Sequence, residues 1–472
     1  MELSIPLLLL RNASLYLPFP PAVIRYGYFS LHVYTETNFR NLKVIMLNIT
    51  NRRVVITGMG LTGPLGNGVS GSWQRLIAGQ SGIRHLDEAA HGDTAIRVGG
   101  QVPSIAQDAA HGFDIDAFIP AKDQRKADRF IHLALAAAEE AISQAGLHNL
   151  AEAAKLRTAT IIATGIGGFH AINNAVKTVA EKGSRRLSPF TIPSFIANLA
   201  ASHVAIKYGF KGALGTPVSA CAASIQSIGD GFRAIRYDEA DFAVVGGSES
   251  CINPVSLGGF QAARALSTGF NDSPEQASRP FDSRREGFVM GEGAGVLVLE
   301  ELSCAQQRGA TILGEVVGYG TTSDAFHITA GPEDGEGAAR AMNIALQQAG
   351  MRGSDIDYVN AHSTSTPVGD LAEINALRRV LGEGAKTAIS STKSATGHLL
   401  GAAGALGAIF SLLAMRDGIA PPSLNIGRLD DHAAGLNVVQ NEARQMTIRS
   451  ALVNGFGFGG VNGSVIFRAF NE

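Results

Sequence analysis

The stretch VVITGMG at residues 54–60 is a short apolar run, rich in β-branched residues and closed by glycines, which is typical of a buried strand. The stretch VVGYG at residues 316–320 repeats this pattern later in the chain. Strand-like runs and Ala-rich helical segments alternate after each of them. This alternation predicts an α/β fold with buried, mostly parallel strands, and the repeated opening suggests that the fold is duplicated.

The sequence also predicts how the two parts pack and where the other helices and strands lie. No Pro- or Ser-rich linker separates the two parts of the pattern, so residues 51–310 and 311–472 are expected to pack as one unit over residues 51–470. The expected helices span residues 125–146 and 337–349, and the expected strands span residues 159–165, 241–247, 295–301, 311–320, 356–363 and 387–394, with a closing hairpin of residues 451–456 and 464–470.

The charge balance excludes several classes of partner. The 472-residue chain carries 39 basic and 41 acidic residues, so it has no overall positive field that would hold nucleic acid or an anionic membrane surface. Its three cysteines form no CxxC pair and are too few for a disulfide framework. This excludes the common cysteine zinc sites and favours a reducing compartment.

Residues 1–50 form an N-terminal extension that does not share the pattern of the rest. The apolar run from Ile5 to Leu10 is too short to span a bilayer, and Glu2 rather than a basic residue precedes it, unlike a secretory signal peptide. The extension is poor in acidic residues and carries several arginines, so an organelle transit peptide is one alternative. The favoured interpretation is an upstream start codon, with Met46 as the working start.

A second apolar stretch, LLGAAGALGAIFSLLAM at residues 399–415, carries no charge. Its length is at the lower limit for a membrane span, and its first half is dominated by Gly and Ala. A helix that is apolar on all sides is more often the centre of a large soluble domain, so we predict a buried core helix here.

Residues 58–63 read GMGLTG, a G-x-G-x-x-G motif directly after a strand, as in dinucleotide-binding folds. Pro64 and two further glycines follow, so no helix starts at the third glycine. The acidic residue expected about 20 residues later is also missing. A dinucleotide-dependent oxidoreductase is therefore a minor alternative.

Cys221 lies in PVSACAAS, residues 217–224, between a strand-like stretch and the helix expected over residues 222–237. Small residues surround it, and the free N–H groups and dipole of the helix favour the thiolate. The alternative is a buried structural cysteine, which is the commoner state and the one we assign to Cys251 and Cys304.

Two histidines follow predicted strands in segments rich in Ser, Thr and Gly: His362 in NAHSTSTPVGD, and His398 in STKSATGH, which also holds Lys393. Each alone would be taken for a buried core histidine. A Cys–His hydrolase would need only one histidine as base. A cysteine with two histidines favours carbon–carbon bond formation, in which one acyl group waits on sulfur while a second is made carbanion-like.

Together these segments resemble the β-ketoacyl-[acyl-carrier-protein] synthase family of thiolase-like condensing enzymes, and its type II synthases (KAS II) in particular. The resemblance covers residues 51–470. It rests on seven motifs in order: VVITGMGLTGPLG, SACAAS, GGFQAARALST, SRPFDSRREGFVMGEGAG, NAHSTSTPVGD, STKSATGHLLGAAG and NGFGFGGVNGS.

The resemblance implies a thiolase-like duplicated α/β fold with five layers, α-β-α-β-α, in a homodimer. It implies decarboxylative Claisen condensation of malonyl-ACP (ACP, acyl carrier protein) with an acyl-ACP, which gives β-ketoacyl-ACP, ACP and CO2 in fatty acid chain elongation. It further implies a cytoplasmic enzyme whose partner is the acyl carrier protein and which needs no metal or other cofactor.

The resemblance also assigns roles to matched residues. Cys221 would carry the acyl chain as a thioester, and His362 and His398 would polarise the malonyl thioester and stabilise its enolate. The backbone N–H groups of Cys221 and Phe458 would form the oxyanion hole. Lys393 would have a structural and electrostatic role, with Glu373 as its acidic partner.

Two further groups of residues match positions around the substrate. Thr364 and Thr366 match threonines that hold the phosphopantetheine arm. The residues that match the gate of the acyl pocket are Ile166, Phe456 and Phe458.

Three residues depart from the family pattern: Ser363 replaces Gly or Ala, Ala395 replaces Met, and Gly455 replaces Ser. They flank the matched positions and concern substrate preference. A specialised ketosynthase of polyketide or unusual lipid synthesis is therefore an alternative. A non-catalytic partner resembling a chain-length factor is disfavoured, because such proteins lack the cysteine.

An acidic carrier protein requires a basic docking surface, although a solvated helix face has the same composition. The candidate cations are the dense run of Lys122, Arg125, Lys126 and Arg129, followed by Arg264 and Arg308.

Overall fold

The computed structural model of the protein describes residues 23–26, 29–32, 52–382 and 384–470. The chain divides into two units, Met1–Ile49 and Thr50–Glu472. In the first unit, β1 (Val23–Tyr26) pairs antiparallel with β2 (Phe29–His32). The proposed working start at Met46 and the apolar run at residues 5–10 lie outside the described residues.

One eleven-stranded sheet runs through the second unit, and its strand order is symmetric about the pair β11–β3. On each side of that pair, two antiparallel pairings are followed by two parallel ones. The order is β13 (Ala388–Ser390), β12 (Tyr358–Asn360), β16 (Ser450–Gly457), β17 (Val461–Arg468), β11 (Gly314–Ser323), β3 (Val54–Gly63), β10 (Gly293–Glu301), β9 (Phe242–Glu249), β7 (Thr158–Ala163) and β8 (Leu214–Gly215), with β4 (Gly66–Asn67) beside β3.

The expectation of mostly parallel strands is therefore wrong. In each half only the two outer pairings are parallel. The consecutive strands β9 and β10 pair antiparallel, and so do the consecutive strands β16 and β17. The predicted closing hairpin is confirmed as β16–β17. The strand expected over residues 387–394 ends early, at Ser390, since the chain turns into the short helix α14 (Lys393–Thr396).

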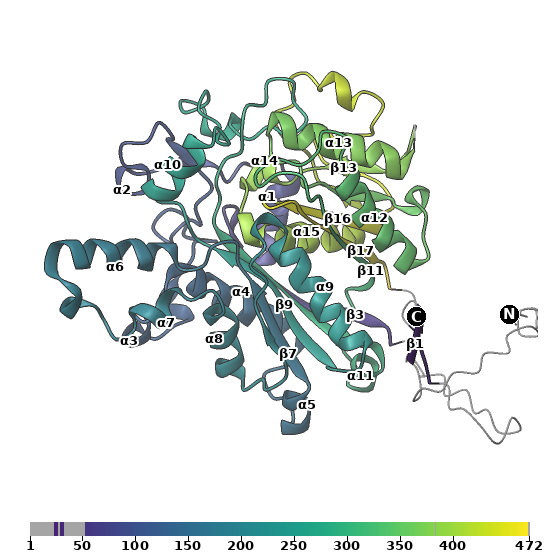
Figure 1. The fold of residues 1–472 in the computed structure, drawn as a ribbon, viewed down its shortest axis with the longest axis horizontal. Helices are drawn as coiled ribbons and strands as arrows, with labels where there is room; N and C mark the ends of the chain where they lie inside the picture. The colour runs from purple at the N-terminus through teal and green to yellow at the C-terminus, as the bar shows by residue number, and fades with distance from the viewer. Residues whose placement is uncertain (1–22, 27–28, 33–51, 383, 471–472) are drawn as a thin grey trace, which may run out of the picture. The chain divides into compact units, whose positions relative to one another are not determined.

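The helices form three layers around the two halves of the sheet (Figure 1). The central layer is α9 (Ala223–Arg236) and α15 (Ala403–Asp417), which contact strands of both halves. One outer layer contains α4 (Arg129–Ala145) and α8 (Leu199–Tyr208), and the other contains α12 (Glu336–Ala349) and α13 (Pro367–Leu381). The five-layered α-β-α-β-α arrangement expected from the resemblance is confirmed.

The shorter elements lie at the margins of these layers. They are α1 (Val69–Ile77), α2 (Glu88–His91), α3 (Ala121–Gln124), α5 (Glu152–Leu156), α6 (Phe169–Lys182), α7 (Thr191–Phe195), α10 (Pro254–Ala262) and α11 (Leu302–Gln307), with the strand pairs β5 (Arg84–His85) and β6 (Val98–Gly99), and β14 (Ile419–Ala420) and β15 (Arg444–Gln445).

The glycines of the two matching stretches make the same packing contact in each half. A Cβ on Gly60 of β3 would lie 1.9 Å from the carbonyl oxygen of Ala137 in α4. A Cβ on Gly320 of β11 would lie 2.0 Å from the carbonyl oxygen of Ala341 in α12. Only glycine lets the outer helix approach its strand this closely, so the repeated sequence reflects a repeated packing contact.

A second pair of contacts repeats as well. The backbone N–H of Met59 donates to Gln144 Oε1, and that of Tyr319 donates to Gln348 Oε1, each at 2.7 Å. In both halves the helix glutamine thus bonds the strand residue that lies between the two glycines. The duplication suggested by the sequence extends to individual hydrogen bonds.

The G-x-G-x-x-G motif at residues 58–63 lies wholly inside β3. It therefore forms no turn between a strand and a helix. Gly58 and Gly60 face α4, and Gly63 faces Leu406 of α15. The structure excludes this motif as a dinucleotide site.

The stretch Leu400–Asp417 is long and apolar enough to cross a membrane, but 89% of it is buried inside the protein. It forms the whole of the short 3₁₀ turn Leu400–Ala402 and of α15, in the central layer between the two halves of the sheet. The prediction of a buried core helix is confirmed.

Replacing Gly60 by Ala is expected to lower the free energy of unfolding by about 1–3 kcal/mol, because the added methyl group meets a backbone oxygen that cannot rotate away. Urea denaturation followed by circular dichroism measures this. The control is Gly259→Ala in α10, where nothing lies within 4 Å of the added methyl group and stability should be unchanged or slightly higher. Equal stability of the two variants would contradict the packing argument.

Candidate active site

Cys221 lies in the middle of a 3₁₀ turn, Ala220–Ala222, which leads directly into α9. Ala220 before it has φ 49°, a conformation that costs energy for a residue with a side chain. The turn places the thiol at the N-terminal end of the central helix, as the sequence predicts. Cys221 is partly buried, whereas Cys251 is fully buried.

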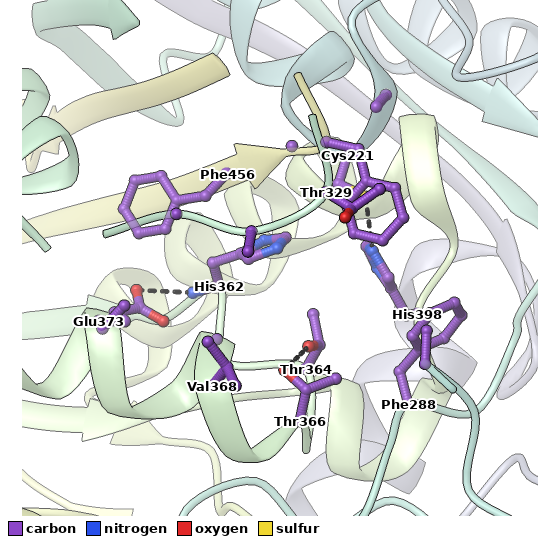
Figure 2. A pocket seen from close by; sticks show the side chains of 18 of the residues that line it. Cys221, Phe288, Thr329, His362, Thr364, Thr366, Val368, Glu373, His398 and Phe456 are labelled. Atoms are coloured by element: carbon purple, nitrogen blue, oxygen red, sulfur yellow. Dashed lines mark hydrogen bonds between the residues drawn. The ribbon is translucent and has the colours of Figure 1, made fainter. Parts of the chain in front are cut away.

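The two histidines reach the same point from the other half. His362 follows β12, as predicted. His398 does not follow a strand directly, since α14 intervenes after β13, but it does precede the turn Leu400–Ala402 that opens α15. The ends of β12 and the starts of α9 and α15 therefore meet around the thiol (Figure 2).

The structure brings the three predicted side chains together. His398 Nε2 and Cys221 Sγ share a hydrogen bond of 2.9 Å. The rings of His362 and His398 lie 5.4 Å apart at an angle of 83°, and Figure 2 shows both imidazoles turned toward Cys221. One ligand-type atom from each of the three lies within 4.8 Å of the others, a spacing that a metal ion could also use.

Both imidazoles are neutral at neutral pH. Burial lowers the pKa of His362 and of His398 well below the usual value, and the nearby Lys393 cation lowers both pKa values further. A neutral imidazole has one N–H to donate and one free lone pair. The pair is therefore suited to donate hydrogen bonds to a carbonyl oxygen, rather than to act as imidazolium acids.

The surroundings of Cys221 act on its pKa in opposite directions. Burial raises the pKa of Cys221 to about 12, and the charge of Glu249 also raises it. Lys393 and the backbone N–H groups of Cys221 and Phe458 act in the opposite direction, as expected for a helix N-terminus, but desolvation outweighs them. These two N–H groups are the ones expected to form the oxyanion hole.

Lys393 is 5% exposed, and its Nζ donates to the carbonyl oxygen of Ala361 at 3.2 Å. Burial lowers the pKa of Lys393 to about 8, although the charges of Glu373, Cys221 and Asp370 act to raise it. Its cation lies beside the two histidines and acts through its charge.

Glu373 supports the backbone of His362. Its Oε1 accepts from the N–H of His362 at 2.8 Å and from Asn454 Nδ2 at 2.9 Å, and its Oε2 accepts from the N–H and the hydroxyl of Ser363. Ser363 is one of the departures from the family pattern, and its hydroxyl adds a bond to this support. Glu373 acts on Lys393 through charge and holds His362 by contact.

The site opens into a cavity of about 510 Å³. Thr364 and Thr366 line it, with their hydroxyl oxygens 3.2 Å apart. The predicted gate residues line the same cavity: Ile166 and Phe458 are 36% and 40% exposed, and the ring of Phe456 lies 5.6 Å from that of His362. All the predicted site residues except Lys393 border this cavity, and Lys393 lies behind it.

Sequence reasoning missed two groups here. Phe288, in the FVMGEG segment, packs edge-on against His398 with ring centres 5.3 Å apart. Glu249, in the GGSES segment, is fully buried, and its charge acts on the Cys221 thiol. A buried carboxylate inside a strand that otherwise reads as apolar is the signal that would have singled out Glu249.

The basic run is only partly available for docking. Arg129 donates three hydrogen bonds to the buried carboxylate of Glu292, and Arg308 donates two to Glu300. The prediction that these two arginines help to dock a carrier protein is therefore wrong. Lys126 pairs with Asp123 at 2.6 Å.

The remaining cations lie in more open positions. Lys122 is exposed. Arg125 and Arg186 line a second hollow, of about 430 Å³, and Arg264 lines the catalytic cavity.

Two sequence profiles match the chain: "Beta-ketoacyl synthase, N-terminal domain" over residues 51–305 and "Beta-ketoacyl synthase, C-terminal domain" over residues 313–427. Among curated proteins, the 3-oxoacyl-[acyl-carrier-protein] synthase 2 of Rhizobium meliloti (strain 1021) is 48% identical over 421 residues, which is 89% of this chain and 99% of that protein. The mitochondrial 3-oxoacyl-[acyl-carrier-protein] synthase of Arabidopsis thaliana is 46% identical over 433 residues, 89% of this chain and 94% of that protein.

Solved structures agree with these matches. A beta-ketoacyl synthase from Burkholderia phymatum superposes with a TM-score of 0.81 at 35% identity, covering 89% of this chain and all of that one. A type II PKS ketosynthase, solved with its acyl-carrier protein, superposes with a TM-score of 0.80 at 32% identity and covers 89% of this chain and 100% of that one.

Proposed function

The chain belongs to the beta-ketoacyl synthase family, and on that premise we propose that Cys221, His362 and His398 perform the condensation of malonyl-ACP with acyl-ACP. The activity is that of a 3-oxoacyl-[acyl-carrier-protein] synthase of fatty acid synthesis. The observation that carries the residue assignment is the 2.9 Å contact between His398 and the Cys221 thiol, beside a second neutral histidine.

The first half-reaction loads the enzyme. His398 Nε2 takes the thiol proton as Cys221 Sγ attacks the acyl-ACP thioester, which forms the new S–C bond. The C–S bond to the carrier breaks, and the leaving carrier thiolate takes a proton from solvent. His398 keeps the thiol proton on Nε2 and releases its Nδ1 proton, so that it is again neutral and its Nε2–H can donate in the second half-reaction. A neutral histidine in contact with the thiol supports this step, because a thiol with a pKa near 12 needs a local proton acceptor.

The second half-reaction forms the carbon–carbon bond. The malonyl thioester oxygen accepts hydrogen bonds from His362 and His398, and the electron pair of the breaking C–CO2 bond forms the enolate. The enolate carbon attacks the acyl group on Cys221, with its oxyanion at the N–H groups of Cys221 and Phe458. The Cys221 thiolate then leaves and takes one proton from solvent.

Substrate positioning follows from the cavity. Thr364 and Thr366 are proposed to hold the phosphopantetheine arm, and Ile166, Phe456 and Phe458 to border the acyl chain. Residues 51–310 and 311–472 are proposed as the two halves of one ketosynthase domain, in which the first supplies the cysteine and the second supplies both histidines. The reaction as written needs no metal ion or redox cofactor.

Cys221→Ala is expected to abolish formation of β-ketoacyl-ACP from acyl-ACP and malonyl-ACP, assayed by mass spectrometry in buffer with EDTA. The same variant should still release CO2 from malonyl-ACP, whereas His362→Ala and His398→Ala should lose that release by about 100-fold or more. Cys304→Ala is the matched control with full activity. A wild-type protein that is active only without EDTA, or a Cys221→Ala variant that still condenses, would contradict the assignment.

The polyketide alternative differs from the fatty acid assignment in its substrate and not in its chemistry. The curated relatives at 44–48% identity are named 3-oxoacyl-[acyl-carrier-protein] synthases, and a type II PKS ketosynthase structure matches at 32%. A series of acyl-ACP substrates in the assay above separates the two readings, since preference for a polyene or aromatic starter would favour the specialised pathway.

We propose that Lys122 and Arg125, with Arg186 across the second hollow, meet the acidic carrier protein. The double variant Lys122→Glu/Arg125→Glu is expected to raise KM for malonyl-ACP about tenfold or more while leaving kcat nearly unchanged, since the charges steer docking and not chemistry. Lys386→Glu, an exposed lysine in the other half, is the control. An unchanged KM in the double variant would reject this surface.

We propose a homodimer that joins the open sheet edge at β8 to its copy across a twofold axis. Exposed apolar side chains flank that edge, among them Ile206 (79%), Leu214 (47%) and Val218 (54%). Light scattering should give about twice the chain mass of 49.2 kDa, and Ile206→Asp should shift it toward the monomer. Ile344→Asp in α12 should remain dimeric, and a monomeric wild type would overturn the proposal.

We propose a cytoplasmic location, in line with the balanced charge and sparse cysteines. The Arabidopsis relative is named as mitochondrial, so residues 1–50 could instead direct import. Cell fractionation with sequencing of the native N-terminus decides between a start at Met46 and a cleaved leader.

A further inference from the structure

Glu249, the last residue of β9, is a fully buried carboxylate that the condensation steps above do not use. Its Oε1 accepts a hydrogen bond from the Thr164 hydroxyl at 2.9 Å. Its Oε2 accepts from the backbone N–H groups of Gly165 at 2.6 Å and Gly401 at 3.0 Å. Burial raises the pKa of the Glu249 carboxyl, whereas these hydrogen bonds all come from donors and so favour its ionised, acceptor-only form.

The carboxylate joins two segments that belong to different halves of the protein. Gly165 follows β7, and Gly401 lies in the turn that opens α15. A Cβ on Gly401 would lie 2.1 Å from the nitrogen of Gly165, so the two backbones are as close as glycine allows. The neighbouring residues, Ile166 on one segment and Leu400 on the other, both line the cavity beside Cys221.

The two halves of the fold have corresponding positions, so the surroundings of Glu249 can be compared with those of Cys221. Gly401 and Cys221 correspond, since each is the middle residue of the 3₁₀ turn before a central helix. The residues before them, Leu400 (φ 45°) and Ala220 (φ 49°), share the same unusual backbone conformation. The N–H of Gly401 is therefore the counterpart of the Cys221 N–H that is proposed for the oxyanion hole.

Glu249 and Gly457 also correspond, as the last residues of the eight-residue strands β9 and β16. A Cβ on Gly457 would lie 3.1 Å from the Cys221 nitrogen, so the glycine keeps the space before that N–H free. At the corresponding place in the other half, the Glu249 carboxylate fills that space. One N–H is left open for a substrate oxygen, and its counterpart is occupied by the protein's own anion.

We propose that Glu249 is a positioning residue that ties the segment Thr164–Ile166 to the start of α15 and so fixes Ile166 and Leu400 on the two sides of the acyl chain at Cys221. This inference rests on the proposed function for its acyl chain. A second effect follows from the same placement, because the Glu249 charge also raises the pKa of Cys221. Glu249 would therefore set both the width of the acyl side of the cavity and the reactivity of the free thiol.

Two variants separate these effects. Glu249→Gln can keep the geometry, since its amide oxygen can accept from Gly165 and Gly401 and its NH2 can donate to the Thr164 hydroxyl, but it removes the charge. Iodoacetamide should then alkylate Cys221 about threefold faster at pH 8, because a lower thiol pKa gives more thiolate. Glu249→Ala leaves the N–H groups unpaired, so the ratio of kcat/KM for long over short acyl-ACP substrates should fall about tenfold.

Glu140→Gln is the matched control. Glu140 also accepts two backbone N–H bonds, from Leu61 and Val69, but does not line the cavity. Mass spectrometry assigns the alkylation to Cys221 rather than to Cys251 or Cys304. The control should match the wild type in alkylation rate and chain-length profile.

The proposal is overturned if Glu249→Ala keeps the wild-type chain-length profile, or if Glu249→Gln is alkylated no faster than Glu140→Gln. If Glu249→Ala does not fold, the alkylation comparison with Glu249→Gln decides alone. Alkylation does not require condensation. A wild type that fails to condense would contradict the proposed function, but the difference in alkylation rate between the variants could still be measured.

Discussion

The contact between α9 and α15 is the constraint on which the active site depends. A Cβ on Gly404 of α15 would lie 2.5 Å from the Ile225 side chain of α9, and Ser224 Oγ accepts the N–H of Ala405 at 3.0 Å. The two helices are thus locked together near their first turns. The turns that open both helices therefore lie at one point, where the N–H of Gly401 is bonded to Glu249 and that of Cys221 is proposed for the oxyanion hole.

Desolvation governs the chemistry of that point more than any single charge. It holds both histidines neutral, keeps the thiol protonated and depresses the pKa of Lys393 to about 8. The same dry setting strengthens each hydrogen bond to a developing oxyanion, because little water competes for it. The N–H groups at the helix N-terminus lower the pKa of Cys221 but do not outweigh desolvation, so the thiol needs His398 in contact.

Much of this could be predicted from the sequence where the motifs are local. The residues around Cys221, His362 and His398 sit in short segments whose Gly, Ser and Thr content marks tight turns, and the repeated VVITGMG and VVGYG stretches mark the two central strands. Apart from the closing hairpin β16–β17, the antiparallel pairings were not predictable, because strand order depends on contacts between distant segments. The ion pair of Arg129 with Glu292 was missed for the same reason, since the two residues are 163 positions apart. The pair of Arg308 with Glu300 was missed because it depends on how α11 turns back beside β10.

The burial of α15 also bears on how the chain is made. Strands of the N-terminal half, β9 and β10, and strands of the C-terminal half, β12 and β16, all contact this apolar helix. During synthesis the strands of the first half leave the ribosome before α15 does, and domains generally fold as they emerge. The first half therefore offers a ready apolar surface to the helix as it appears. Without the first half, the side of α15 that packs against β9 and β10 would be left uncovered.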